Sequence, residues 1–157
     1  DQPAREAPLL NVFGGKLTAY RRVAENGLEK IGEAIGVKGS AWTATSRLPG
    51  GNFEATAYAG EVDALLKAYL FLERGHAERL VRCYGTDARS ILAGAVRAED
   101  MGRHFGGSLY ECEVRWLIER EWARSAEDVL WRRTKQGLFL TAGEATELET
   151  YMAAAVA

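Results

Sequence analysis

The sequence predicts a mainly α fold, a compact bundle of about six helices with one strand at its N-terminus. Three observations predict it. Apolar residues recur at helical spacing over most of the chain, and capping boxes begin three of the later segments. Only one short apolar run, near the start, has the character of a strand. We therefore expect no second strand in this chain.

The strand-like segment is residues 8–15. It is a short apolar run closed by Gly14 and Gly15, which is typical of a buried strand entering a turn. A single strand has no ladder partner in a helical domain, and its backbone groups need one. We therefore expect its sheet to lie in a part of the protein that this chain does not contain, which makes the chain a fragment.

Helical periodicity begins at Thr18 and runs to Ile35, with Gly36 as the expected stop. Residues 37–60 are rich in Gly, Ser, Thr and Pro and predict a long connection. The remaining helices are expected over residues 60–70 with Gly60 as N-cap, over 73–84, over 86–95, and after the capping boxes Ser108/Glu111, Ser125/Asp128 and Thr141/Glu144.

The composition is that of an ordinary globular domain, with 47% hydrophobic and 27% charged residues in 157. It excludes a disordered or fibrous chain, and no apolar run is long enough to span a membrane. No signal peptide is expected. Twenty basic and 22 acidic residues give a net charge of -2, which does not indicate nucleic-acid binding. Two cysteines, Cys83 and Cys112, indicate a reducing cytoplasm and small packing residues rather than reactive thiols.

The candidate functional motif is the corner formed by residues 11–21, a strand followed by two glycines, Lys16 and a helix start. Backbone amides at a helix N-terminus can approach an anionic group there, and the lysine adds positive charge. The phosphate-loop pattern is absent. Taken alone, a Gly-Gly-Lys corner is more often only a strand-to-helix connection.

Several motifs carry a family resemblance. Residues 12–21, Val-Phe-Gly-Gly-Lys-Leu-Thr-Ala-Tyr-Arg, resemble the Gly-Gly-Lys-Leu-Thr-Thr-Tyr-Arg signature of FAD-dependent glycerol-3-phosphate dehydrogenases, with Ala19 where many relatives have a second Thr. The downstream segments are also similar to that family, in the order Ala41-Trp-Thr43, Leu48-Pro-Gly-Gly51, Leu80-Val-Arg-Cys-Tyr-Gly85, Glu119-Arg-Glu-Trp-Ala123 and Glu127-Asp-Val-Leu-Trp-Arg-Arg-Thr134.

The resemblance implies a two-part oxidoreductase of glycerol metabolism. Its FAD domain oxidises sn-glycerol 3-phosphate to dihydroxyacetone phosphate and passes the electrons to quinone. Residues 1–36 would be the last strand and helix of that domain, and residues 37–157 a helical C-terminal cap domain. The dinucleotide fingerprint is absent, so the fragment by itself is expected to be inactive. The full-length enzyme would be cytoplasmic and peripheral on the inner face of the membrane.

Within this resemblance, the residues expected to face the flavin are Gly14, Gly15, Lys16, Leu17 and Thr18. Reduced flavin is negative around N1 and the C2 carbonyl, so helix amides and the Lys16 ammonium would favour it. No catalytic set is complete, and Lys16 has at most an electrostatic role. No metal site is expected, because His76 and His104 lack partners at ligand spacing.

Some alternatives remain open from the sequence. The chain could instead be a non-catalytic helical docking domain, and the N-terminal strand could pair two copies as a homodimer. Residues 48–53 could form a lid, a docking loop or an ordered turn packed on the helices. Arg132 and Arg133 could bind an anion, although ion pairs with Glu119, Glu121 or Asp128 are the simpler interpretation. The tryptophans, Trp42, Trp116, Trp122 and Trp131, are expected to be core or groove anchors.

Overall fold

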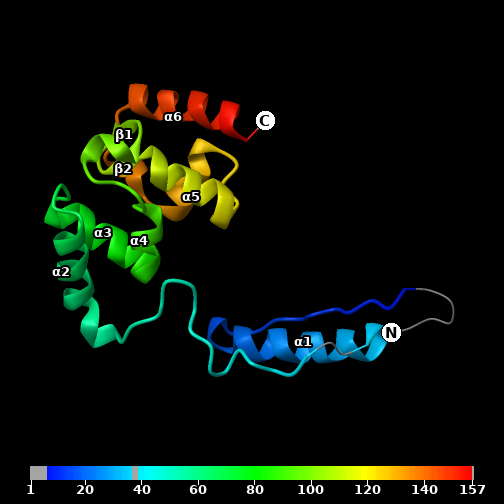
Figure 1. Cartoon of the computed structure of the whole chain (residues 1–157). Coiled ribbons are helices and arrows are strands. Elements are labelled where there is room, and N and C mark those ends of the chain that lie inside the picture. Colours follow the sequence, from blue (N-terminus) through cyan, green and yellow to red (C-terminus); the bar gives the residue numbers. More distant parts are fainter. Residues whose placement is uncertain (1–6, 37–38, 157) are drawn as a thin grey trace. The chain divides into compact units, whose positions relative to one another are not determined.

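The computed structural model describes residues 7–36 and 39–156. The chain divides into two compact units, residues 1–47 and residues 48–157, which we call the N-terminal unit and the C-terminal unit. Figure 1 traces the element order within each unit. The predicted mainly α fold is confirmed, with six α-helices in the described residues, α1 in the N-terminal unit and α2–α6 in the C-terminal unit.

The N-terminal unit is an extended segment lying beside one helix. A 3-10 turn, η1 (Leu17–Ala19), leads into α1 (Tyr20–Ile35), which ends as predicted at Gly36. The extended segment runs back along α1 (Figure 1), and a Cβ at Gly27 would lie 3.7 Å from Cδ2 of Leu10. Residues 7–16 form no β-ladder with any described residue. The predicted strand therefore has the extended backbone of a strand but no partner here.

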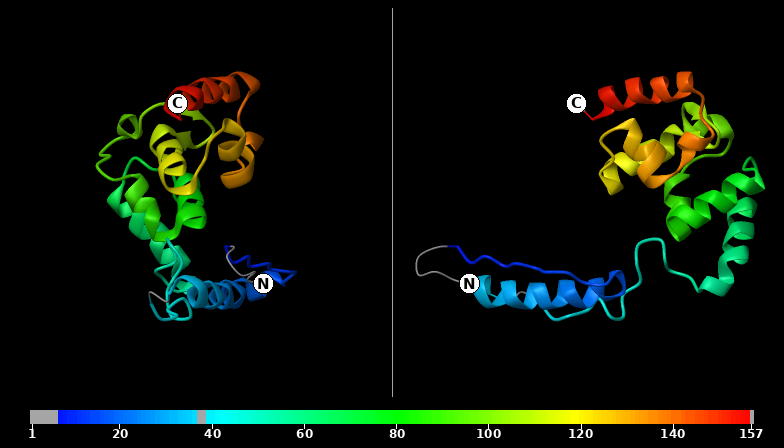
Figure 2. Two further views of the ribbon diagram at one scale, coloured as in Figure 1. Left: turned by 90° about the vertical axis from the view of Figure 1, so that its right-hand side faces the viewer. Right: turned by 180° about the vertical axis from the view of Figure 1, so that it is seen from behind.

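The C-terminal unit contains the hydrophobic core. Its α-helices are α2 (Tyr58–Ala68), α3 (Arg74–Tyr84), α4 (Ala88–Ile91), α5 (Glu111–Glu121) and α6 (Ala142–Ala155). Its shorter turns are η2 (Ala55–Ala57), η3 (Gly85–Asp87), η4 (Ala98–Met101), the π-helix η5 (Asp128–Arg133) and η6 (Gln136–Leu138). Figure 2 shows α6 across one end of this unit, where Leu148 and Met152 are buried.

A small β-hairpin corrects two predictions. β1 (His104–Gly106) pairs antiparallel with β2 (Leu109–Tyr110), so the expectation of no second strand is wrong. The Ser108/Glu111 capping box is wrong for the same reason. Gly106 and Gly107 have φ of +116° and +54°, which allows the chain to reverse sharply before Ser108. The helix α5 begins only at Glu111, with Tyr110 as N-cap.

The other helix boundaries agree with the predicted ones in some cases and differ in others. The Thr141/Glu144 capping box is confirmed with both reciprocal bonds, and α3 ends at Gly85 as predicted. Gly60 is not an N-cap, because α2 begins at Tyr58. The helix expected over 86–95 is shorter, since it comprises only η3 and α4, and Gly94 turns the chain with φ of +83°.

Candidate functional site

The Gly14–Thr18 corner has the backbone that its two glycines predict. Gly14 and Gly15 have φ of +69° and +134°, a region that residues with a Cβ rarely adopt. Lys16 then takes the extended conformation of an N-cap, and its carbonyl accepts the Ala19 amide at 2.9 Å. The first amides of a helix have no carbonyl partner within it. Among the described residues the amides of Leu17 and Thr18 therefore have no backbone acceptor, and they follow directly on two residues without side chains.

The side chains around this corner are exposed. Leu17 is 88% and Phe13 91% exposed, and Lys16 has no ion-pair partner among the described residues. An open, mostly apolar groove lies between the extended segment and the first half of α1, lined in part by Leu10, Val12, Leu17, Tyr20 and Val23. Among the described residues of the N-terminal unit, the corner thus combines the Lys16 ammonium, which has no ion pair there, with the Leu17 and Thr18 amides and an apolar groove.

A second feature of the N-terminal unit is a polar cluster, which we call the Arg21 clamp: Arg21, Glu25 and Thr43. The Thr43 hydroxyl donates to Glu25 Oε1 at 2.5 Å, and Arg21 Nη1 donates to the same oxygen at 2.9 Å. Arg21 Nη1 also lies 3.4 Å from Thr43 Oγ1. The Thr43 hydrogen bond, followed by the neighbouring arginine charges, lowers the pKa of Glu25 below its ordinary value. The clamp fastens the segment after α1 to that helix.

Two of the family-like motifs meet in the C-terminal unit. A Cβ at Gly50 would lie 2.1 Å from the Tyr84 carbonyl oxygen, and a Cβ at Gly85 would lie 2.0 Å from the Gly50 carbonyl oxygen. The Thr86 amide donates to that Gly50 oxygen at 2.9 Å. Both glycines are required because the two backbones touch. The segment after Leu48 is therefore an ordered turn packed on the end of α3, not a lid.

A buried polar network joins α3, the hairpin and α5. Arg79 forms a bidentate ion pair with Glu113, with both N···O distances at 2.7 Å, and donates to Ser108 Oγ at 2.6 Å. The Tyr84 hydroxyl donates to Glu113 at 2.6 Å, and the buried Gln136 accepts the Ser108 amide at 3.1 Å. Each buried polar atom among the described side chains has a partner. The network holds the helices together and offers no free group to a ligand.

Sequence analysis missed this network, although a signal for it existed. Glu113 is 1% exposed, and it lies three residues after Tyr110 and four before Leu117, on the inner face of α5. A carboxylate on an otherwise apolar stripe indicates a buried partner of opposite charge. Nothing in the sequence, however, identifies Arg79 as that partner, because it is 34 residues away.

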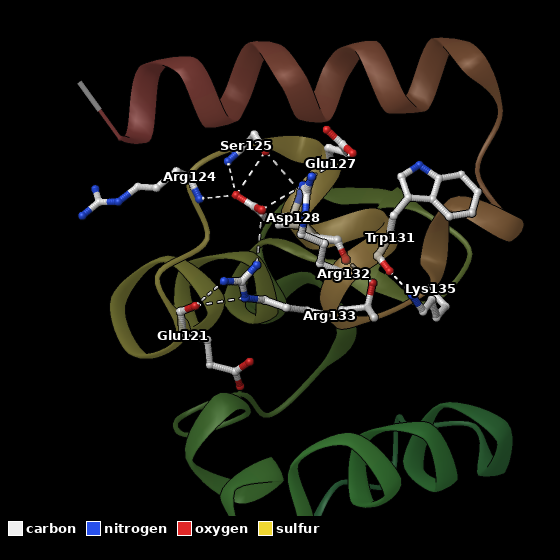
Figure 3. Close-up of polar contacts among 11 residues, drawn as sticks. Glu121, Arg124, Ser125, Glu127, Asp128, Trp131, Arg132, Arg133 and Lys135 are labelled. Carbon is white, nitrogen blue, oxygen red and sulfur yellow. Dashed lines mark hydrogen bonds and ion pairs between the residues drawn. The ribbon is translucent and has the colours of Figure 1, made fainter. Parts of the chain in front are cut away.

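The Arg132–Arg133 pair is occupied by internal contacts (Figure 3). Arg132 forms ion pairs with Asp128 and Glu127 at 3.0 Å each. Arg133 lies 3.6 Å from Asp128 and donates twice to the Glu121 carbonyl at the end of α5. The ion-pair interpretation is confirmed through Asp128. Glu121 contributes its backbone rather than its carboxylate.

Asp128 is the centre of this cluster. It accepts the backbone amides of Arg124 and Ser125 at 2.9 and 3.1 Å, and its own amide donates to Ser125 Oγ at 3.2 Å. These hydrogen bonds lower the pKa of Asp128 to about 2, and the bond from the Arg124 amide has the largest effect. The predicted Ser125/Asp128 capping box therefore forms with both reciprocal bonds, at the start of the helical residues 126–127 that lead into the π-helix η5.

The tryptophans are placed differently from one another. Trp116 packs against the core, and Trp42 lines a hollow beside α1 in the N-terminal unit. Trp122 is 79% exposed and takes φ of +55° at the C-cap of α5, so a core position is wrong for it. Trp131 is 45% exposed, with its indole against Gly137, where a Cβ would lie 2.6 Å from the ring.

The two histidines contact an aromatic ring, and the two cysteines are free thiols. Both imidazoles contact the Tyr110 ring: His76 stacks on it with centroids 5.7 Å apart, and His104 lies tilted against it at 4.6 Å. Burial, followed by the charge of Arg79, lowers the pKa of His76 to about 4, and burial raises the pKa of both thiols. In the described ranges, no three His, Cys, Asp or Glu side chains gather as metal ligands. Nor is any helix in these ranges long and apolar enough to cross a bilayer.

Comparison with known proteins adds the following findings. Residues 41–157 match the family model described as the C-terminal domain of alpha-glycerophosphate oxidase. The chain is 44% identical over 138 residues to D-erythritol 1-phosphate dehydrogenase of Brucella abortus, which covers 88% of this chain and 28% of that protein. It is 42% identical over 149 residues to aerobic glycerol-3-phosphate dehydrogenase of Escherichia coli, covering 94% of this chain and 29% of that protein.

A third relative gives the same picture. Glycerol-3-phosphate dehydrogenase of Pseudomonas aeruginosa is 44% identical over 147 residues, covering 94% of this chain and 28% of that protein. The chain thus spans less than a third of the length of the curated relatives that it matches.

Proposed function

The chain belongs to the family of C-terminal domains of alpha-glycerophosphate oxidase, and from that premise we propose that it is the C-terminal part of an FAD-dependent glycerol-3-phosphate dehydrogenase. The family resemblance of its motifs is confirmed by the family match and by relatives named for that activity. The proposed reaction is oxidation of sn-glycerol 3-phosphate to dihydroxyacetone phosphate, with quinone as the electron acceptor. A similar polyol phosphate is the alternative substrate, because one relative is named for D-erythritol 1-phosphate.

The single observation that carries the proposal is the Gly14–Thr18 corner. Its glycines leave a turn without side chains, and a Cβ at Gly14 would meet no atom within 4 Å. The amides of Leu17 and Thr18 precede α1, and the Lys16 ammonium has no ion pair with any residue that the structure describes. These features fit the electron-rich edge of an isoalloxazine ring. When bound, FAD accepts the hydride from the alcohol carbon of the substrate and becomes negative around N1 and the C2 carbonyl.

The role of the corner is electrostatic. The amides of Leu17 and Thr18 would donate to the carbonyl edge, and the Lys16 ammonium would lower the free energy of the negative form relative to the neutral form. Preorganised dipoles and charges of this kind act without reorganising during the reaction. No carboxylate or imidazole of the described residues lines the groove at this corner, and we place the catalytic base in the FAD-binding part of the longer protein.

The exposed apolar side chains of the N-terminal unit support the proposed domain division. Leu9, Val12, Phe13 and Leu28 are each more than 60% exposed, which is expected if residues 1–36 complete an FAD-binding domain that covers them. Residues 37–157 would then be the helical cap. A second copy of this chain, paired through residues 8–13, is the alternative partner when that domain is absent. Peripheral attachment to the inner face of the cytoplasmic membrane is part of the same proposal.

The test is Lys16→Met in the longer protein. We expect the flavin midpoint potential to fall by roughly 30 mV, equivalent to about 1.4 kcal/mol for two electrons. Reduction by glycerol 3-phosphate should slow accordingly. The matched control is Lys30→Met, which removes a lysine of α1 that pairs with Glu33 at 3.5 Å and lies away from the corner. An unchanged potential and rate in Lys16→Met would show that Lys16 is only a corner residue.

A further inference from the structure

Arg21 ends the signature-like motif, one and a half helical turns after Lys16. An arginine near a proposed phosphate-ester site is by its chemistry a candidate phosphate ligand, because its guanidinium binds phosphate oxygens in pairs. The contacts of the Arg21 clamp indicate a different role. We propose that Arg21 is a positioning residue, which through Glu25 holds Thr43 and the Trp42 turn against α1, and that it does not bind the substrate phosphate.

The first argument is the occupancy of the guanidinium. Arg21 Nη1 donates to Glu25 Oε1 at 2.9 Å and lies 3.4 Å from the Thr43 hydroxyl. The Arg21 side chain is 34% exposed and that of Glu25 only 13%. A carboxylate withdrawn from water in this way needs its cationic partner, so removing Arg21 would leave a poorly solvated negative charge.

The second argument is charge. The pKa of Glu25 is lowered, so its carboxylate is ionised at neutral pH. A phosphate dianion bound at Arg21 would lie within a few ångströms of that carboxylate, and the like charges would repel each other. Arg22 is also directed to Glu25, at 3.5 Å. Both arginines therefore pair with the Glu25 carboxylate, whereas Lys16 has no ion-pair partner in the part of the chain that the structure describes.

The third argument is what the clamp holds. Thr43 is 18 residues from Glu25 in sequence, so its 2.5 Å hydrogen bond closes a long connection onto the helix. Beside it, the Thr45 amide donates to the Trp42 carbonyl at 3.3 Å and forms a turn. This turn places Trp42 in the hollow that Ile31 and Ile35 also line. The position of Trp42 in this hollow therefore depends on the hydrogen bonds of the Arg21 clamp.

The first experiment uses the 157-residue chain and needs no flavin. Arg21→Gln and Thr43→Val should each raise the exchange rate of the Thr45 amide by about tenfold, as expected for loss of a hydrogen bond to a charged group. The double variant should exchange no faster than the faster single variant, because both changes break one unit. Thr43→Ser keeps the hydroxyl and should retain the slow rate of the parent chain. The matched control is Lys30→Gln, which removes a cation of α1 that pairs with Glu33 rather than with Glu25. If the two substitutions raise the exchange rate of the Thr45 amide additively, or if Thr43→Val leaves that rate unchanged, the proposed role of Arg21 is wrong.

The second experiment uses the longer protein, and this arm rests on the proposed function. Arg21→Gln and Thr43→Val should change turnover alike and leave the KM for glycerol 3-phosphate within about twofold. A KM raised tenfold or more by Arg21→Gln but not by Thr43→Val would show that Arg21 binds the phosphate, and would overturn the proposal. If the longer protein does not oxidise glycerol 3-phosphate, the proposed function is wrong. The amide-exchange experiment still tests the positioning role of Arg21, so failure of one proposal can be told from failure of the other.

Discussion

The two units of the chain use their apolar residues in opposite ways. In the C-terminal unit these side chains form one buried cluster, in which Phe105, Val114 and Leu117 are fully shielded from solvent. In the N-terminal unit no described residue is buried, and α1 presents Leu28 and Ile35 at 66% exposure each. The comparison teaches that helical periodicity alone does not create a core. A helix needs facing elements to cover its apolar stripe, and the described residues place no second helix or sheet against α1, only the extended segment before it and the connection after it.

The largest expected effect on the free energy of unfolding comes from replacing one leucine in each unit by alanine. Leu117→Ala should lower the free energy of unfolding by about 2–5 kcal/mol, because it opens a cavity in the core around a residue that is 0% exposed. Leu28→Ala, at 66% exposure, should change it by less than about 0.5 kcal/mol. Urea unfolding followed by circular dichroism measures both. Equal losses would show that the N-terminal unit shares a core, which would remove the distinction between the units.

The next effect concerns the backbone contact inside the C-terminal unit. Gly85→Ala should cost about 3 kcal/mol, at the upper end of typical point substitutions, because the new Cβ would lie 2.0 Å from the Gly50 carbonyl oxygen. The matched control is Gly94→Ala, which has φ of +83° but no atom within 4 Å. It should cost only the conformational strain, about 1 kcal/mol. Thermal unfolding of the two variants compares them directly, and similar costs would refute the role given to the Gly50–Gly85 crossing.

A smaller expected effect is that the two units lose stability at different pH values. Burial lowers the pKa of His76 from 6.5 to about 4, so the folded C-terminal unit binds this proton less readily than the unfolded chain. Its contribution to stability is therefore complete above pH 6.5 and is lost as the pH falls toward 4. Glu25 in the N-terminal unit has a pKa below 4.5, so the Arg21 clamp should loosen only at lower pH than that.

The variant that tests this pH dependence is His76→Phe, which keeps an aromatic ring against Tyr110. The free energy of unfolding of the variant should fall less than that of the parent chain between pH 7 and pH 5. Identical slopes for the two proteins would show that another group causes the acid sensitivity.

The sequence predicted the local features of the fold well. Helix α1 ends at Gly36, α3 ends at Gly85, and Thr141 with Glu144 begins α6, because each depends on residues close together in the chain. The hairpin at residues 104–110 was not predicted. Its strands are too short to show an alternating pattern of apolar and polar residues. The three-residue spacing of Ser108 and Glu111 is also that of a capping box, which wrongly predicted a helix start at Ser108.

The candidate site shows the same division. The positive φ values of Gly14 and Gly15 follow from the paired glycines, so the shape of the corner could be predicted. The contacts of Arg79 with Glu113 and of Glu25 with Thr43 could not, because they join residues 34 and 18 positions apart. Such pairs depend on how helices pack, and a single sequence does not show which charged residues face each other.

The central proposal is that the C-terminal unit folds by itself, while residues 1–36 of the N-terminal unit complete an FAD-binding domain that lies elsewhere. The most direct measurement is urea unfolding of a chain that begins at Leu48, compared with the 157-residue chain. We expect a cooperative transition whose free energy agrees within about 0.5 kcal/mol, the usual effect of changes that touch no core. A loss of cooperative unfolding in the shorter chain would contradict the claim, because it would show that residues 1–47 belong to the core of this domain.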